Sequence, residues 1–314
     1  MKVPFQRGAA LLTAMIIVTL IATLASAMVW RQFRAVQVEA ADRARAQAAW
    51  ILQGALDFGR LILREDARGN QTEPVDHLGE AWATPLAEAR LSTFLAADAT
   101  TTDDGPEAFL SGGLSDAQAL YNLRNLVAGD KVLPAEQRTL ERLCDSAVVP
   151  PGTASLIIAK LRNAFISGGD ASSTALQPKT LDQLAWLGLS TDTVTRLRPL
   201  MTLLPAATPV NLNTAPREVI AALFDGLDLA SAERLVRARQ AKPLRSVQEA
   251  KAFFPEAVVL SSERAAVVSS YFIVNSRLRL DERVMEERSL VQRRGLDMLV
   301  LDRQRVNQVL EPNR

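Results

Sequence analysis

Residues 7–30 read RGAALLTAMIIVTLIATLASAMVW, and the interpretation of this stretch decides the fold of the whole chain. No charged side chain occurs between Ala9 and Trp30. A helix over that run would extend about 33 Å, which is enough to cross a hydrocarbon core of about 30 Å. Lys2 and Arg7 precede the run, and a short basic N-terminus is typical of the cytoplasmic side of a membrane. The stretch therefore predicts a single-pass anchor with the bulk of the chain on the far side.

The helix is expected to continue beyond the membrane. No proline occurs between residues 31 and 66, and apolar or small residues recur there at the spacing of one helical face. These residues are Val36, Ala40, Ala44, Ile51, Ala55, Phe58 and Ile62. The pattern predicts one helix of about 55 residues that starts in the membrane and ends packed on a soluble domain. A cleaved secretory signal is the alternative, because the Ala-Ser-Ala sequence before Met28 has the small residues of a cleavage site.

The composition of the 314 residues narrows the function classes. With 48% apolar and 23% charged residues the chain is typical of folded proteins, and its net charge of +1 gives no general attraction to nucleic acid. Cys144 is the only cysteine, so no intramolecular disulfide can form. His77 is the only histidine, whereas most catalytic zinc sites and hydrolytic triads need one. No acid, base and nucleophile set stands out, so we expect no enzyme.

Apolar and polar residues alternate with the period of a β-strand in two parts of the chain. Three such segments follow one another at the C-terminus, at 271–280, 284–293 and 296–305. They predict an antiparallel meander whose buried face is covered by the N-terminal helix. Upstream, residues 109–123 are interpreted as a hairpin with a turn at 115–118 and a second strand ending near Leu123.

From residue 127 to 267 the pattern is helical, with breaks at proline and glycine. Within this region 184–190 (LAWLGLS) corresponds to 222–228 (ALFDGLD), and an Arg-Leu pair follows each glycine at the same spacing. The approximate repeat of about 38 residues predicts two copies of helix, glycine-centred turn and helix. Such a pair makes a small module of the sterile-alpha (SAM) or helix-hairpin-helix kind.

The sharpest local motif is VNLNTAP at 210–216. Its Thr214 is predicted to cap the N-terminus of the helix that follows, with Pro216 in the first turn.

A similar motif opens helix-hairpin-helix modules that bind DNA, so a membrane-tethered DNA-binding protein of the competence type is an alternative function. Such hairpins use Gly-x-Gly to bring bare backbone N–H groups close to a phosphate. Here Asp228 replaces the second glycine. Residues 205–271 hold eight basic and seven acidic side chains, which leaves little net charge for phosphate contacts. Nucleic acid is therefore not an expected partner.

The first residues of the chain resemble a type IV prepilin or pseudopilin N-terminus. In that family a short basic leader ends in glycine, here Gly8 after Arg7, directly before the apolar helix. The resemblance implies that a prepilin peptidase cuts after Gly8 and methylates the new terminus at Ala9. Most pilins carry a glutamate five residues into the mature chain, where this sequence has Thr13. A subunit without that costly intramembrane carboxylate resembles the K-type minor pseudopilin of type II secretion, which is placed at the fibre tip.

Three further segments resemble the same K-type family. They are the Trp-Ala-Thr-Pro element at 82–85, the sequence YNLRN at 121–125 and the sequence NLNTA at 211–215. The match at 121–125 is partial, because Arg124 and Asn125 depart from the family's Asn-Leu-Asn. The structural residues of the most specific element are Asn211, Asn213, Thr214 and Pro216.

The resemblance implies an α+β, type IV pilin-like fold, in which the long N-terminal helix packs on an antiparallel sheet, with a large inserted all-α domain that is SAM-like or helix-hairpin-helix-like. The expected segments are a leader at 1–8, a transmembrane part at 9–30, a first part of the pilin-like core at 31–126, an inserted domain with two SAM-like repeats at 127–267, and C-terminal strands at 268–314.

The family also implies partners and a location. We expect assembly with the I-, J- and H-type minor pseudopilins at the pseudopilus tip, where the complex initiates the fibre and helps export folded proteins across the outer membrane. The expected location is the inner membrane, single-pass, with the C-terminal bulk in the periplasm, and then the pseudopilus after processing. Secreted substrates are possible further partners. Partner helices are expected to pack on Leu12, Ile16, Ile17, Leu20 and Leu24.

No cofactor is evident from the sequence, and calcium is the one ion considered. Asp103, Asp104 and Glu107 form a polar turn whose carboxylates are weak candidates for calcium ligands. Members of the K-type family are similar in having calcium sites, but theirs use a longer acidic loop later in the chain. The corresponding stretch here, 166–174, offers only Asp170. No metal site is therefore assigned.

Overall fold

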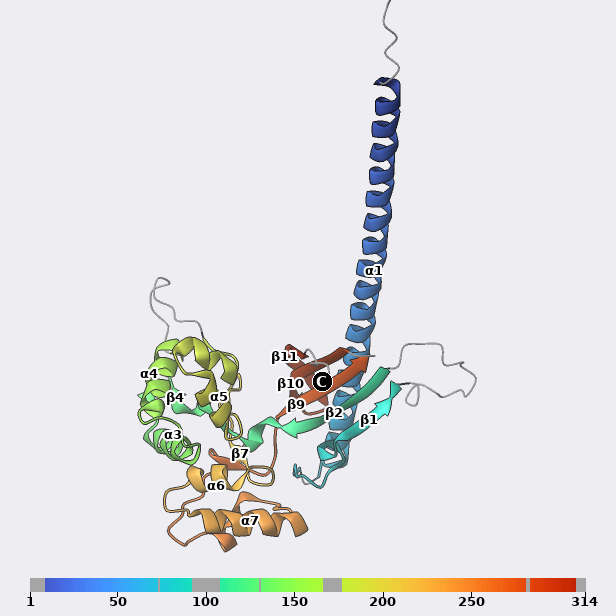
Figure 1. Cartoon of the computed structure of the whole chain (residues 1–314). Coiled ribbons are helices and arrows are strands. Elements are labelled where there is room, and N and C mark those ends of the chain that lie inside the picture. Colours follow the sequence, from blue (N-terminus) through green and yellow to red (C-terminus); the bar gives the residue numbers. More distant parts are fainter. Residues whose placement is uncertain are drawn as a thin grey trace, which may run out of the picture. The chain divides into compact units, whose positions relative to one another are not determined.

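The computed structural model of the protein describes residues 9–72, 74–91, 108–129, 131–165, 177–280 and 283–308 (Figure 1). The chain forms two compact units, one ending at Gly54 and the other beginning at Ala55. A long N-terminal helix, an antiparallel sheet and several shorter helices are present, so the predicted α+β class is confirmed.

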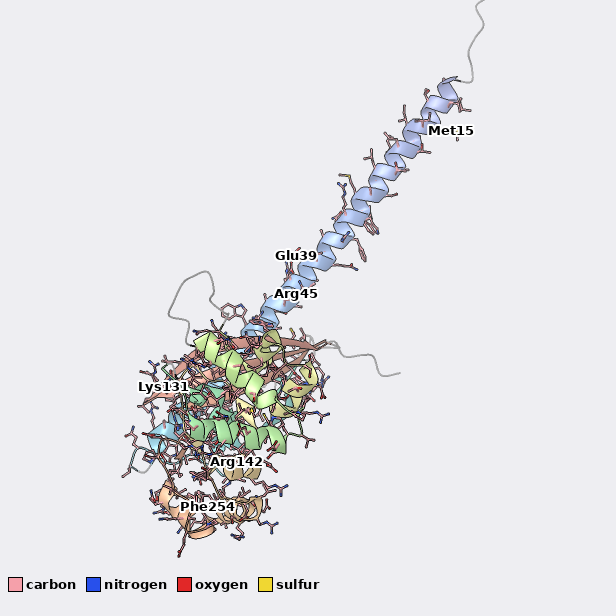
Figure 2. The ribbon with its side chains drawn as sticks, turned by 90° about the vertical axis from the view of Figure 1, so that its left-hand side faces the viewer. Met15, Glu39, Arg45, Lys131, Arg142 and Phe254 are labelled. Atoms are coloured by element: carbon pink, nitrogen blue, oxygen red, sulfur yellow. The ribbon has the colours of Figure 1, made fainter. Side chains whose placement is uncertain are left out.

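Helix α1 spans Ala9–Gly69 and is 61 residues long, which confirms the predicted continuous helix. It is the one helix in the described part of the chain that is long and apolar enough to cross a membrane. Side chains project from it on all sides, as Met15, Glu39 and Arg45 show in Figure 2. Below the apolar run the surface of the helix is charged, and Glu39 pairs with Arg43 one turn later at 2.5 Å.

The main sheet has five strands in the order β1-β2-β9-β10-β11, and every neighbouring pair is antiparallel. The strands are β1 (Leu86–Arg90), β2 (Ala108–Asp116), β9 (Tyr271–Leu280), β10 (Arg283–Arg294) and β11 (Asp297–Gln308). The last three form the predicted C-terminal meander, which is confirmed. Because β2 pairs with β9, segments from before and after the helical region complete one sheet.

The end of α1 covers one face of this sheet, as expected. Leu56 and Leu63 are buried in a cluster with Phe272, Val274 and three further side chains, Trp82, Val291 and Met298. The predicted contact face is wrong in detail, because Phe58 is 52% exposed. Leu52, Leu56 and Leu63 form a second apolar series beside the predicted one, so the periodicity alone leaves the direction of the buried face open.

The predicted hairpin at 109–123 is wrong. Strand β2 continues through two glycines to Asp116 and pairs with β9, and a 3₁₀ turn, η2 (Ala117–Ala119), then redirects the chain. The short strand β3 (Tyr121–Asn122) pairs in parallel with β6 (Met201–Thr202). Alternation shows that a segment is extended but does not identify its partner, and here each partner comes from far along the chain.

The helical region lies between β2 and β9. Its α-helices are α3 (Pro134–Ser146), α4 (Thr153–Phe165), α5 (Thr191–Leu197), α6 (Arg217–Leu223) and α7 (Leu229–Ala241). Besides η2, the described residues form the 3₁₀ helices η1 (Ala81–Ala83), which precedes β1, and η3 (Leu123–Leu126), η4 (Leu181–Leu187) and η5 (Val247–Phe253). Short strand pairs are β4 (Val127–Ala128) with β5 (Lys131–Val132), and β7 (Val210–Asn211) with β8 (Ala265–Ala266). A single large apolar cluster fills the interior of this region.

The two repeated segments have the same turn geometry. Gly188 and Gly226 both have positive φ, at 98° and 79°, a conformation that glycine adopts without strain. Two residues later Ser190 and Asp228 each cap the next helix by accepting a hydrogen bond from a backbone N–H. The copies differ in the first helix, which is a 3₁₀ helix at η4 and an α-helix at α6.

Candidate functional site

A buried group of polar side chains connects the sheet to the helical region, and we call it the polar junction. It consists of Asp76, Asp116, Asn211, Thr214 and Ser269. Oδ2 of Asp116, at the end of β2, accepts hydrogen bonds from Asn211 Nδ2 at 3.0 Å and from the hydroxyls of Thr214 and Ser269, both at 2.6 Å. One carboxylate oxygen thus joins three segments that lie far apart in the sequence.

The two asparagines of the NLNTA element use both ends of their amide groups. Asn211 Nδ2 also donates to the backbone carbonyl of Asp76 at 3.1 Å, and its Oδ1 accepts from Asn213 N–H at 2.9 Å. Asn213 donates to the carbonyl of Leu244 and accepts from the N–H of Leu244, each at 2.9 Å. Arg239 of α7, also buried, donates to the carbonyl of Leu212. These bonds satisfy buried backbone groups that would otherwise be costly.

The predicted capping role of Thr214 is wrong. Helix α6 begins at Arg217, its N-cap is Pro216, and no side chain caps it. The Thr214 hydroxyl donates instead to Asp116 and, at 3.3 Å, to the carbonyl of Asn211. The helix starts later than the motif suggests, and the hydroxyl lies against Asp116, 98 positions upstream, a contact that local pattern cannot reveal.

The segment YNLRN contributes a second pair of asparagines with the same function. Asn122 donates to the carbonyl of Ala206 at 2.8 Å and accepts from the N–H of Leu204 at 3.1 Å. Asn125 exchanges two hydrogen bonds with the backbone of Thr208, at 2.8 and 3.0 Å. Asn125, which blurs the sequence match to the family pattern, therefore holds the loop that leads into β7.

Burial of Asp116 raises its pKa to about 6. Its hydrogen bonds from Ser269, Thr214 and the backbone N–H of Gln118 favour the ionised form and oppose that shift. The carboxylate accepts hydrogen bonds from four donors. The junction is therefore built for holding segments together rather than for proton transfer.

An acidic group beside the junction was missed by sequence reasoning. Asp66 at the end of α1, Asp76 and Glu80 bring carboxylate oxygens within 4.8 Å of one another. Arg293 of β10 forms an ion pair with Asp66 at 3.0 Å and a second one with Asp76. Trp82 donates its indole N–H to Glu80 at 2.7 Å and packs edge-on against Phe272. Asp66 lies on α1 and Asp76 and Glu80 lie in the loop that follows it, at a spacing that matches no metal-binding motif.

The processing residues predicted from the sequence lie at or beyond the edge of the described chain. Arg7 and Gly8 are outside the described residues, and Ala9 is the first residue of α1. Thr13 donates its hydroxyl to the carbonyl of Ala10 at 2.9 Å. A hydroxyl bonded within its own helix is compatible with a lipid environment.

The five predicted packing residues of α1 are all exposed, at 57–64%: Leu12, Ile16, Ile17, Leu20 and Leu24. They are available to a lipid or protein partner, and their role as a packing surface stays a prediction. The weak calcium candidates Asp103, Asp104 and Glu107, and the stretch 166–174, lie outside the described residues.

Asp228 lies at the helix N-terminus where a DNA-binding hairpin would hold a phosphate. Asp228 accepts the N–H of Ser231 at 2.7 Å at the start of α7, so the helix terminus already has an anion. Arg217 is paired with Glu218 and Glu233, and Arg237 with Glu233. Both features weigh against the DNA-binding alternative.

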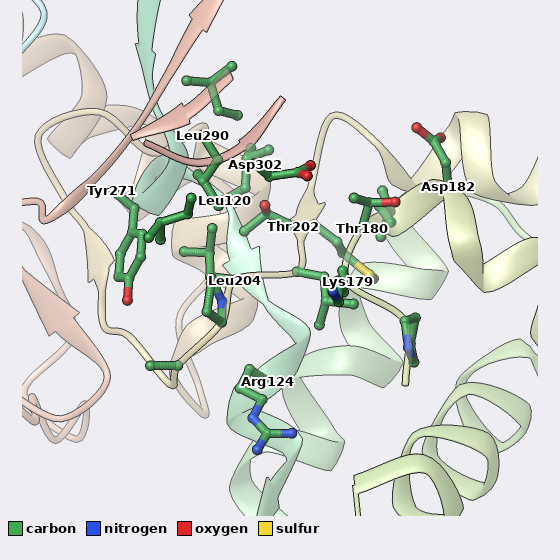
Figure 3. Close-up of a pocket in the computed structure, with 18 of the residues that line it drawn as sticks. Leu120, Arg124, Lys179, Thr180, Asp182, Thr202, Leu204, Tyr271, Leu290 and Asp302 are labelled. Carbon is green, nitrogen blue, oxygen red and sulfur yellow. The ribbon is translucent and has the colours of Figure 1, made fainter. Parts of the chain in front are cut away.

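A cavity of about 620 Å³ lies where β9 and β10 meet the loop after α5. Figure 3 shows Tyr271 and Leu290 of the sheet facing Leu120 and Leu204 across it. Around the rim, Asp182 pairs with Arg198 and Asp302 accepts from Gln304, so these carboxylates have partners. The lining is mixed, because charged side chains such as Arg124, Lys179 and Asp302 stand beside the leucines, and we assign no function to this cavity.

The fold and the polar junction define a class of protein: a pilin-like subunit in which a helical region separates the second strand of the sheet from the third. A sequence model described as Type II secretion system (T2SS), protein K, matches residues 210–266, which begin with the NLNTA element. Type II secretion system protein K of Pseudomonas aeruginosa is 29% identical, with 88% of this chain and 86% of the relative covered. The protein of the same name from Klebsiella pneumoniae is 28% identical, with 95% and 96% covered.

A solved structure has the same fold. A chain in the crystal structure of the GspK-GspI-GspJ complex from the type 2 secretion system of enterotoxigenic Escherichia coli matches with a TM-score of 0.65 at 21% identity. The match covers 85% of this chain and 99% of that one. The chain is thus similar over most of its length to proteins named type II secretion system protein K, and it shares its fold with a chain of the GspK-GspI-GspJ complex.

Proposed function

We propose that this protein assembles with the I-, J- and H-type minor pseudopilins at the tip of the pseudopilus, initiates the fibre and so helps to export folded proteins across the outer membrane. The observation that carries this proposal is the exposed apolar half of α1, which is long enough for a membrane and offers side chains on every face. The solved relative was crystallised as a GspK-GspI-GspJ complex, which supports the choice of partners.

The apolar part of α1 is proposed to have two roles, as a membrane anchor and as a packing surface in the fibre. Before processing, the helix holds the chain in the inner membrane, with the bulk of the protein in the periplasm. A prepilin peptidase then cuts after Gly8 and methylates Ala9, and the same helix packs against partner helices through its exposed leucine and isoleucine side chains. At position 13 the chain has a threonine and therefore no carboxylate. This fits a subunit that enters the fibre first, because no earlier subunit is present whose charge a carboxylate would neutralise.

The role is structural, and we propose no enzymatic activity and no nucleic-acid partner. The described polar groups of the junction hold backbone segments, and Asp228 occupies the position of a bound phosphate. Contact between the helical region and secreted proteins is part of the proposal, because that region adds a surface absent from a simple pilin fold.

Replacing Gly8 tests the proposal. The Gly8→Ala variant is expected to keep its leader and its unmethylated terminus, because the peptidase acts after glycine. Intact-mass and N-terminal analysis of membrane-extracted protein measures both, and pull-down of the partner pseudopilins and secretion assays measure assembly.

The matched control is Gly54→Ala. Gly54 lies in the same helix, and a methyl group there meets no atom within 4 Å. This variant is expected to be processed like the natural protein. Normal processing and assembly of Gly8→Ala would contradict the proposal.

A further inference from the structure

The acidic group beside the polar junction carries more negative than positive charge. Asp66, Asp76 and Glu80 supply three carboxylates, and among the described lysines and arginines Arg293 is the one that forms ion pairs with them. His77 lies 4.0 Å from Glu80 and adds charge only when it is protonated. With the carboxylates ionised, two negative charges remain without a cation.

One carboxylate oxygen in this group is buried and has no donor. Asp76 is 1% exposed, and its Oδ2 accepts from Ser269 N–H at 2.7 Å and from Arg293. Its Oδ1 has no hydrogen-bond partner among the described residues. A buried acceptor left without a donor is costly, and buried polar groups in native proteins are nearly always satisfied. This orphaned oxygen is independent of the clustering of the acids and indicates a missing positive partner.

We propose that Asp66, Asp76 and Glu80 bind one calcium ion. Carboxylate oxygens are hard ligands suited to this ion, and a Ca–O distance of about 2.4 Å places opposite ligands about 4.8 Å apart. The ligand atoms here lie within that limit of one another. Magnesium takes ligands at about 2.1 Å in strict octahedral geometry and keeps several waters, so a buried group of three carboxylates favours calcium.

Asn70 supplies a further ligand after a small change. Its Nδ2 now lies 2.8 Å from Glu80 Oε1 and 3.4 Å from both Asp66 Oδ1 and the carbonyl of Val75. The neutral amide thus occupies a pocket of three oxygens without balancing their charge. A half-turn about the last side-chain bond presents Asn70 Oδ1 to the ion, and the Val75 carbonyl completes a set of oxygen ligands.

The bound ion would fix the loop after α1 in place. Asp66 is on α1, Asp76 and Glu80 are on the loop, and Arg293 connects both to β10. The ion therefore links the end of the long helix to the sheet through side chains that otherwise repel one another.

The test is calcium binding by the full-length protein in detergent after removal of ions with a chelator. Calorimetric titration and thermal unfolding at pH 7.5 are compared for the natural protein, Asp66→Asn and Glu80→Gln. The natural protein is expected to gain several degrees in Tm with millimolar calcium, and each variant to lose at least tenfold in affinity at this site and most of the gain in Tm. Magnesium at the same concentration is expected to give a much smaller gain.

Asp192→Asn is the matched control, because it removes one carboxylate from an exposed pair with Arg196 and is expected to behave like the natural protein. Calcium affinity and Tm gain that are unchanged in Asp66→Asn would overturn the proposal, as would equal gains with magnesium. The proposal would also be overturned if calcium left the Tm of the natural protein unchanged and Asp66→Asn were more stable than the natural protein without calcium. The acidic group would then hold a proton instead of a calcium ion.

Discussion

Gly112 stands where β2 passes closest to β9. A Cβ atom at this position would lie 2.3 Å from the carbonyl oxygen of Asn275, a contact that only a backbone shift could relieve. At the neighbouring Gly113 a Cβ would lie 3.6 Å from Pro85, which is an ordinary contact. Two adjacent glycines thus have different roles, and the requirement for glycine belongs to the first.

Gly112→Ala is expected to lower the free energy of unfolding by about 1–3 kcal/mol, the usual cost of overpacking. Urea unfolding of the full-length protein in detergent, followed by circular dichroism, measures the change. Gly113→Ala is the control and is expected to change stability by less than about 0.5 kcal/mol. Equal stability of the two variants would show that the sheet relaxes at Gly112.

The buried carboxylate of Asp116 predicts a pH effect. Its pKa rises from 3.8 to about 6 on folding, so the folded state binds the proton more tightly. The resulting stabilisation is complete below about pH 4 and is lost as the pH rises through about 6, a total of about 3 kcal/mol at 1.4 kcal/mol per pKa unit. Asp116→Asn cannot titrate, so the difference in stability between the natural protein and this variant is expected to move toward the natural protein by about 2 kcal/mol of that total between pH 7.5 and 4.5.

Denaturant unfolding at these two pH values measures the difference in stability between the natural protein and Asp116→Asn. The titration of carboxylates that both proteins share contributes equally to both and cancels from this difference. Asp225→Asn is the control. Arg138 and Arg142 lower the pKa of Asp225 to about 2, so this carboxylate stays ionised over the whole range. A difference for Asp116→Asn that does not change with pH would show that the Asp116 carboxylate does not titrate in this range.

At the scale of elements, the contact between α1 and the sheet is the one that can be tested directly. Leu63 is fully buried against the sheet, whereas Leu61, two residues earlier, is 48% exposed. Arg60 and Arg64 add hydrogen bonds to the carbonyls of Met298 and Leu296, at 2.9 and 3.1 Å. The helix is therefore held by a narrow apolar stripe with polar contacts on one side.

Leu63→Ala is expected to cost about 2–5 kcal/mol, because it removes buried methyl groups and leaves a cavity. Leu61→Ala is expected to cost less than about 1 kcal/mol. Thermal unfolding of both variants in the same detergent gives the comparison. If Leu61→Ala were as damaging as Leu63→Ala, the buried face of α1 would be assigned incorrectly.

The sequence predicted elements well where the signal was local. The apolar run gave the long helix, and period-two alternation gave β9, β10 and β11 within a few residues of their ends. The prediction failed where a distant partner decided the outcome. Tyr121 was assigned to a hairpin but pairs with Met201, and Thr214 was assigned to a helix cap but donates to Asp116. Local pattern carries no information about such partners.

At the scale of the whole molecule, the sequence again predicted the residues of the site only where the signal was local. The NLNTA element was identified from sequence, and its asparagines do hold the structure together. The group of Asp66, Asp76 and Glu80 was not, and its cation, Arg293, comes from β10, far along the chain. Charge clusters built by tertiary contact need a structure to be seen.

The pairing of β2 with β9 has a consequence for how the chain acquires its shape. During synthesis β2 leaves the ribosome long before its neighbour, and every helix from α3 to α7 is made in between. Closing so large a loop is entropically unfavourable, and non-local pairings of this kind slow folding. Asp116 and Ser269, one at each end of the excursion, meet directly at 2.6 Å and bring the two strands together once the helices have packed. We therefore expect the pairing of β2 with β9 to form after the helical region has packed.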